Sequence, residues 1–204
     1  SVPAGFTAFQ GFDALFHSVE GYIAKGANLM SDMYALTAIE NLAKYLPRAV
    51  KDGNDMEART HVAFANTLSG GVMCLTLLTS EHGMEHALSA YHPSLPHGAG
   101  LIMISRAYFS YFIRKHACDE RFIRMARALG MPEADKPEDF ITALTRLQEA
   151  CGVADLKMSD YGIALDECEK LMRNAREVMG IMFTSDRVQM SDAEIVDIYK
   201  ESWK

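Results

Sequence analysis

Apolar residues recur every three to four positions along almost the whole chain, and this helical period most constrains its fold. Near the start, Phe12, Leu15, Phe16, Val19 and Ile23 share one helical face. No stretch shows the apolar–polar alternation of a half-buried strand, and the chain has neither an internal repeat nor a Gly-rich phosphate loop. The sequence therefore predicts an all-α fold, a bundle of about eight to nine helices.

Turn residues and helix caps divide this pattern into segments. Pro47 and the Lys-Asp-Gly-Asn cluster at 51–54 mark the end of the second helix, and Ser191 with Glu194 forms a capping box at the start of the last one. The expected helices are 7–24, 31–50, 55–79, 81–90, 97–116, 120–129, 138–150, 165–179 and 191–203. The third becomes apolar on every side after Ala63, so we expect it in the middle of the bundle.

Size and charge exclude several classes of protein. With 204 residues the chain has the length of one domain, at most with a small appendage. Its formal charge of −7 argues against nucleic acid or a membrane surface as a partner, because both select basic proteins. The four scattered cysteines include no CxxC pair, which predicts reduced thiols and a cytoplasmic location.

Two groups of polar residues stand out as candidate metal ligands. Asp13 and His17 lie at i and i+4, so their side chains project from one helical face. His82 and His86 repeat that spacing, and His97 follows in a Pro-His-Gly sequence. Together they predict one divalent ion held by Asp13, His17 and histidines between residues 82 and 97. Such a nitrogen-rich site suits Fe(II), Zn(II), Co(II) or Mn(II) better than Ca(II) or Mg(II).

Plainer interpretations compete with a metal site. Asp13 and His17 can simply pair with each other, and a single helical histidine is usually only a satisfied polar residue. His61 and His116 stand among charged residues at helix edges, where we expect no function. The clustering of the other histidines favours the metal.

The run from Gly11 to Glu20 resembles the DAxxHxxE signature of the iron-containing alcohol dehydrogenases. The stretch His82 to Leu88, followed by Pro-His-Gly at 96–98, is similar to that family's second signature. This resemblance implies that the metal ligands are Asp13, His17, His82 and His97, and that His86 lines the substrate pocket as a catalytic proton relay. Gln10 departs from the family, which often has a small hydroxyl residue there.

The resemblance also implies a larger enzyme. Family members join an N-terminal nucleotide-binding domain to a C-terminal helical, dehydroquinate synthase-like domain, and this chain matches only the second, as a single domain over 1–204. We therefore expect a fragment whose chain begins at Ser1, inactive alone. In the whole enzyme, Fe(2+), or Zn(2+) as the alternative metal, polarises a small alcohol or aldehyde, while the absent domain binds NAD or NADP. An apolar face left by that domain makes a homodimer possible.

Three alternatives remain open. A glycerol dehydrogenase-like zinc enzyme shares the two-domain plan, although the complete Pro-His-Gly motif favours the iron branch. An HD-type phosphohydrolase is also all-helical, but it needs an adjacent His-Asp pair, which this chain lacks. The third alternative is a non-enzymatic metal-binding or interaction module.

Overall fold

A computed structural model describes residues 2–204, and within them the chain forms nine α-helices and no strand. The helices are α1 (Ala4–Ile23), α2 (Leu29–Lys51), α3 (Met56–Leu75), α4 (Ser80–Tyr91), α5 (His97–Arg114), α6 (Asp119–Ala128), α7 (Asp139–Ala150), α8 (Cys168–Phe183) and α9 (Asp192–Ser202). Two short 3-10 turns, η1 (Met158–Tyr161) and η2 (Leu165–Glu167), precede α8. The all-α prediction is confirmed.

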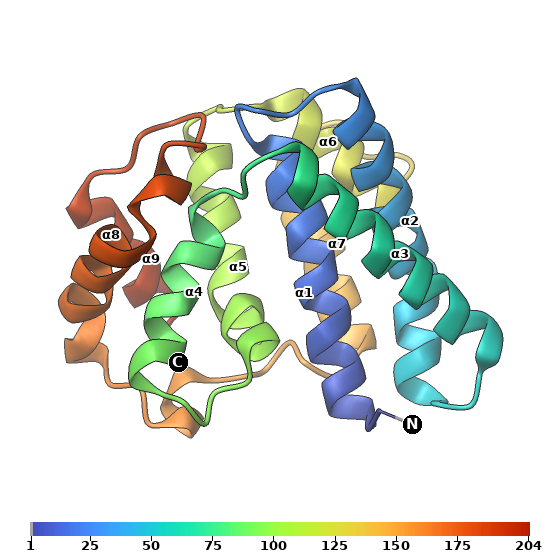
Figure 1. The fold of residues 1–204 in the computed structure, drawn as a ribbon, viewed down its shortest axis with the longest axis horizontal. Helices are drawn as coiled ribbons and strands as arrows, with labels where there is room; N and C mark the ends of the chain where they lie inside the picture. The colour runs from blue at the N-terminus through green and yellow to red at the C-terminus, as the bar shows by residue number, and fades with distance from the viewer. Residues whose placement is uncertain (1) are drawn as a thin grey trace.

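Helices α1 and α5 lie next to each other in the middle of the molecule (Figure 1). On one side α1 packs against α2 and α3, and α6 and α7 pack against each other behind them. On the other side α5 packs against α4 and α9, and α8 contacts both α4 and α9. Side chains at the α1–α5 contact therefore come from segments nearly a hundred residues apart.

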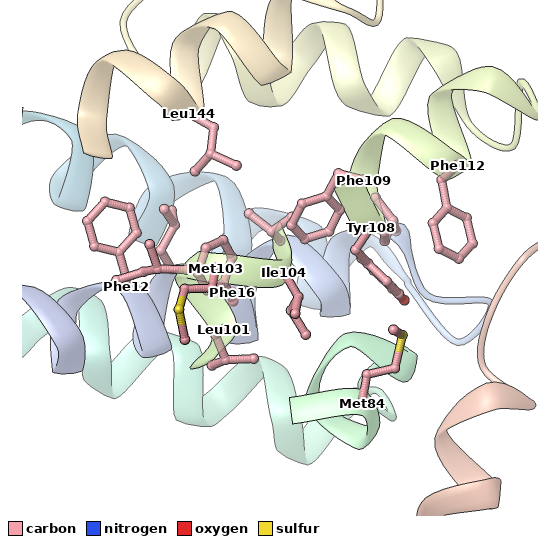
Figure 2. Packing of buried hydrophobic residues seen from close by; sticks show 14 of the residues in the cluster. Phe12, Phe16, Met84, Leu101, Met103, Ile104, Tyr108, Phe109, Phe112 and Leu144 are labelled. Carbon is pink, nitrogen blue, oxygen red and sulfur yellow. The ribbon is translucent and has the colours of Figure 1, made fainter. Parts of the chain in front are cut away.

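Aromatic residues fill the space between these two central helices (Figure 2). The rings of Phe16 and Phe109 stack with centroids 6.0 Å apart, and Phe12 lies 5.9 Å from Phe16. All three are fully buried. Each buried aromatic side chain contributes on the order of 2–3 kcal/mol to folding, so this cluster fixes how α1 meets α5.

The third helix differs from the prediction in both length and position. It ends at Leu75 instead of continuing to residue 79, and α4 starts after a bend of 106°. It lies at the edge of the bundle, where Phe64 and Met73 are 47% and 43% exposed. The expected central position was wrong, because helical periodicity shows which faces are apolar but not what covers them.

The eighth helix is also shifted from the expected 165–179. Leu165–Glu167 forms the 3-10 turn η2, and the α-helix runs from Cys168 to Phe183 across a non-helical residue, Met179. Apolar spacing alone does not reveal such a kink. The capping box of Ser191 and Glu194 at the start of α9 is confirmed.

Within residues 2–204 no single helix is both long and apolar enough to cross a bilayer, and only the bent pair α3–α4 meets that test jointly. The cysteines Cys74, Cys118, Cys151 and Cys168 are free thiols.

Candidate metal centre

The first half of the site comes from one face of α1. Asp13 and His17 lie one helical turn apart, with Asp13 Oδ1 3.6 Å from His17 Nδ1. Both side chains are partly accessible, at 30% and 15% exposure, while the opposite face of α1 is buried in the core. A helix anchored in this way points a carboxylate and an imidazole outward in a fixed orientation.

The second half comes from α4 and the first residue of α5. His82 Nε2 lies 3.3 Å from Asp13 Oδ1, and His97 Nε2 lies 3.4 Å from the same oxygen. Donor atoms of Asp13, His82 and His97 all lie within 4.8 Å of one another. Groups distant in the sequence therefore converge on one point.

The other two candidate histidines lie at the edge of this group. The ring of His17 stacks on His82 with centroids 4.3 Å apart. The ring of His86 lies 5.4 Å from His97 and 6.2 Å from His82. His86 also belongs to a second group of close donors, with Glu85 and His97.

Two buried carboxylates hold the outer nitrogens of the central histidines. His82 Nδ1 contacts Glu20, and His97 Nδ1 contacts Glu85; both glutamates are fully buried. Each carboxylate accepts a hydrogen bond from Nδ1–H, which leaves Nε2 directed at Asp13. Glu20 is itself positioned by the hydroxyl of Thr79, and Glu85 by that of Ser89.

A side chain from the far end of the sequence fixes the start of α4. Asp186 accepts hydrogen bonds from the backbone N–H of Ser80 at 3.0 Å and from its hydroxyl at 2.7 Å. The hydroxyl of Tyr108 donates to Asp186 as well. Asp186 therefore caps the helix that carries His82, although it follows that helix by about a hundred residues.

The carboxylates and the imidazoles of this cluster stabilise each other's charged forms. Burial alone would lower the pKa of His82, but the carboxylates of Glu20 and Asp13 raise it to about 9. Burial would also lower the pKa of His97, but its hydrogen bonds to Asp13 and Glu85 and the charges of these carboxylates raise it to about 10. Burial would raise the pKa of Asp13, yet its contacts with these histidines hold it well below the usual range. A divalent cation entering here would replace protons carried by the histidines.

Two glycines of α5 permit this close assembly. A side-chain Cβ at Gly98 would lie 2.1 Å from the carbonyl oxygen of Phe9, and one at Gly100 would lie 2.5 Å from the carboxylate of Glu85. The first contact is with backbone, which cannot rotate away. Gly98 is therefore required for α5 to approach α1 closely enough for His97 to reach Asp13.

Gly98→Ala is expected to lower the free energy of unfolding by about 2–3 kcal/mol, the usual cost of overpacking a rigid contact. Gly70→Ala is the matched control, because a Cβ at this helical glycine meets nothing within 4 Å. It should raise stability by about 0.5–1 kcal/mol. Urea denaturation of both variants measures the difference, and equal stability would contradict the tight α1–α5 contact.

The remaining histidines lie outside the cluster. His61 stacks on Tyr45 and bonds to Asn41, so it supports the α2–α3 contact. His92 pairs with Glu167, and exposed His116 pairs with Asp119.

Sequence reasoning gave no role to Glu20, although it is the last residue of the first signature, and it did not include Glu85 or Asp186. The first two did leave a signal, because Glu20 lies three positions after His17 and Glu85 three after His82, each on the same helical face as a candidate ligand. Asp186 left none, since only the fold brings it to α4.

The donor set fits a divalent transition metal. Imidazole Nε2 atoms facing a carboxylate oxygen, with Nδ1 bonded to carboxylates behind, form the arrangement that outer-sphere partners give to metal-bound histidines. Exposure of Asp13 and His97 leaves one side of the cluster open to a small ligand.

The chain matches the profile of the Fe-containing alcohol dehydrogenase family, C-terminal, over residues 7–203. It is 30% identical to the NAD-dependent methanol dehydrogenase of Bacillus methanolicus, over 86% of this chain and 46% of that protein. It is 41% identical to alcohol dehydrogenase 4 of Schizosaccharomyces pombe, over 83% of this chain and 41% of that protein.

Solved structures show the same fold. An archaeal halo-thermophilic alcohol dehydrogenase from a Red Sea brine pool superposes with a TM-score of 0.93 at 29% identity, over 99% of this chain and 52% of that one. The chain thus spans about half the length of the curated relatives and solved structures that it matches.

Proposed function

The chain belongs to the Fe-containing alcohol dehydrogenase family, as its C-terminal part, and from that premise we propose that it is the metal-binding catalytic domain of an NAD(P)-dependent alcohol dehydrogenase. The observation that carries the proposal is the convergence of His82 Nε2 and His97 Nε2 on one oxygen of Asp13. A structural salt bridge does not need two imidazoles on one carboxylate oxygen, with a second buried carboxylate behind each ring.

We assign Asp13, His17, His82 and His97 as ligands of one Fe(2+), with Zn(2+) as the alternative metal. Three of these groups already offer donors within 4.8 Å of one another. His17 adjoins them, because its ring stacks on that of His82 and its Nδ1 lies 3.6 Å from Asp13 Oδ1. Glu20 and Glu85 keep the rings of His82 and His97 in place.

A bound ion would supply Lewis-acid chemistry, polarising the oxygen of an alcohol or aldehyde. His86 moves the proton in this proposal. Its imidazole is half-buried beside His97, and burial lowers its pKa, so at neutral pH it is uncharged and accepts a proton through a ring nitrogen. It lies one turn from His82 without entering the central donor group, which separates proton transfer from metal binding.

Hydride transfer needs a nicotinamide within about 3.5 Å of the reacting carbon. A second, nucleotide-binding domain of the same protein supplies it in our proposal, since the relatives are about twice as long as this chain and one is named NAD-dependent. The substrate is a small alcohol or aldehyde in the cytoplasm.

The 204-residue chain alone is therefore expected to bind metal but not to oxidise alcohols. Purified chain should take up about one equivalent of Fe(II) and show neither micromolar binding of NAD or NADP by calorimetry nor turnover of short alcohols. The protein extended by the nucleotide-binding domain should oxidise them, lose activity to a chelator and regain it with Fe(II). Turnover by the chain alone, or chelator-resistant turnover by the longer protein, would contradict the proposal.

A further inference from the structure

A groove between α1 and α3 begins at Asp13 and leads away from the metal cluster. It has a volume of about 470 Å³. One wall carries Thr7, Gln10 and Ala14, which share a face of α1, and the other carries Arg59, Ala63 and Asn66, which share a face of α3. Of the four assigned ligands only Asp13 lines this groove, so a molecule lying in it has one end beside that ligand.

Charged groups are present only at the two ends of this groove. Asp13 and Arg59 are its only charged lining residues, and the lining between them includes Gly11, Ala14, Val62 and Ala63. Arg59 donates to Thr7, which precedes Asp13 by six residues, or about 9 Å along the helix. The groove is therefore lined between its ends by apolar side chains and by the uncharged polar side chains of Gln10 and Asn66, and it is positive at its far end.

The guanidinium of Arg59 is held in place but keeps binding capacity. It donates from Nε to the carbonyl of Gly53, from Nη1 to the hydroxyl of Thr7 and from Nη2 to the carbonyl of Val2. Five N–H groups are available, so one N–H on each terminal nitrogen is left over. Within residues 2–204 it makes no ion pair with a carboxylate, in contrast to Arg48, which pairs with two. A guanidinium that is fixed in this way and has no carboxylate partner can bind the carboxylate of a ligand through two N–H groups.

Resting on the proposed function, we infer that the preferred substrate class is an ω-hydroxy acid, or the corresponding aldehyde, with Arg59 as its specificity-determining residue. The hydroxyl lies beside Asp13 and the carboxylate lies about 3 Å from the Arg59 guanidinium. The molecule then spans roughly 6 Å of the groove, which corresponds to a chain of about four to six carbons.

The test is calorimetric titration of the Zn(II)-loaded chain with 5-hydroxypentanoate and with the uncharged 1,5-pentanediol. We expect the acid to bind about tenfold more tightly than the diol, and Arg59→Met to reduce this ratio to about one. Arg106→Met is the matched control, because Arg106 also donates to a backbone carbonyl, that of Ala154, but lies outside the groove. It should leave the ratio unchanged.

Arg59→Met also loses structural hydrogen bonds and can misfold, so a second variant that keeps Arg59 is needed. Ala63→Phe fills the middle of the groove and leaves Arg59 intact, so it should weaken binding of both compounds at least about tenfold. Equal affinity of the wild-type chain for acid and diol, or unchanged acid binding in either variant, overturns the inference. The inference is also overturned if Arg59→Met weakens the binding of nicotinamide mononucleotide alone. In that case Arg59 would bind a cofactor phosphate.

Failure of the inference is distinguishable from failure of the proposed function. A chain that holds Zn(II) and binds acid and diol equally retains the proposed metal centre and contradicts only the role of Arg59. A chain that takes up no metal contradicts both.

Discussion

Alanine at Asp13, His17, His82 or His97 is expected to reduce the metal content of the purified chain to a small fraction of the wild-type value. Each change removes one of four protein donors, so water has to replace it and only three side chains hold the ion. The affinity should fall by more than about 100-fold, beyond the usual effect of removing a hydrogen-bond partner behind a ligand. Elemental analysis after dialysis measures the outcome.

His86→Ala is the control for these four variants. His86 lies on the same helix as His82 and also faces the cluster, but its ring is 6.2 Å from that of His82. This variant should keep its metal, and in the longer protein it should lower kcat about 100-fold through loss of the proton relay. Loss of metal from His86→Ala together with retention by His82→Ala would reverse the assignment.

The second large effect is expected from replacing the buried glutamates behind the histidines. Glu20→Ala and Glu85→Ala are each expected to lower metal affinity about 10–100-fold, because each leaves an Nδ1–H without an acceptor and frees a ring to rotate. The contacts are to His82 and His97 respectively. Competition with a chromophoric chelator measures the affinities.

Glu81→Gln is the matched control for the glutamate variants. Glu81 is as deeply buried as Glu20 and adjoins His82 in the sequence, but neither of its carboxylate oxygens has a hydrogen-bond partner. Burial and the nearby Glu20 raise its pKa. The neutral amide should leave metal affinity within about threefold of wild type. Equal losses in Glu20→Ala and Glu81→Gln would show that the effect is general disruption of α4.

The sequence predicted the all-α fold and most of the helix positions because both depend on local spacing. The four-residue interval of Asp13 and His17 is a property of one helix, and their place on an accessible face of α1 agrees with it. The end of α3 and its position at the edge were not predicted, since they depend on what packs against it. The cap that Asp186 provides for α4 depends on the tertiary fold in the same way.

The position of the site within the fold also lay beyond the sequence. Helical periodicity predicted the faces that carry Asp13 and His82, but not that α4 follows a bend of 106° and brings His82 to 3.3 Å from Asp13. That approach depends on glycines without side chains, such as Gly98, whose role appears only when Phe9 is seen beside it.

X-ray absorption spectroscopy of the metal-loaded chain tests the central claim most directly, because it reports the atoms bound to the ion. The account predicts about three imidazole nitrogens and one carboxylate oxygen at roughly 2.0–2.2 Å, with the multiple scattering typical of histidine and no sulfur. His97→Ala should remove one imidazole contribution. A sulfur shell near 2.3 Å from one of the four cysteines, or a shell of oxygen alone, would contradict a metal centre built from Asp13, His17, His82 and His97.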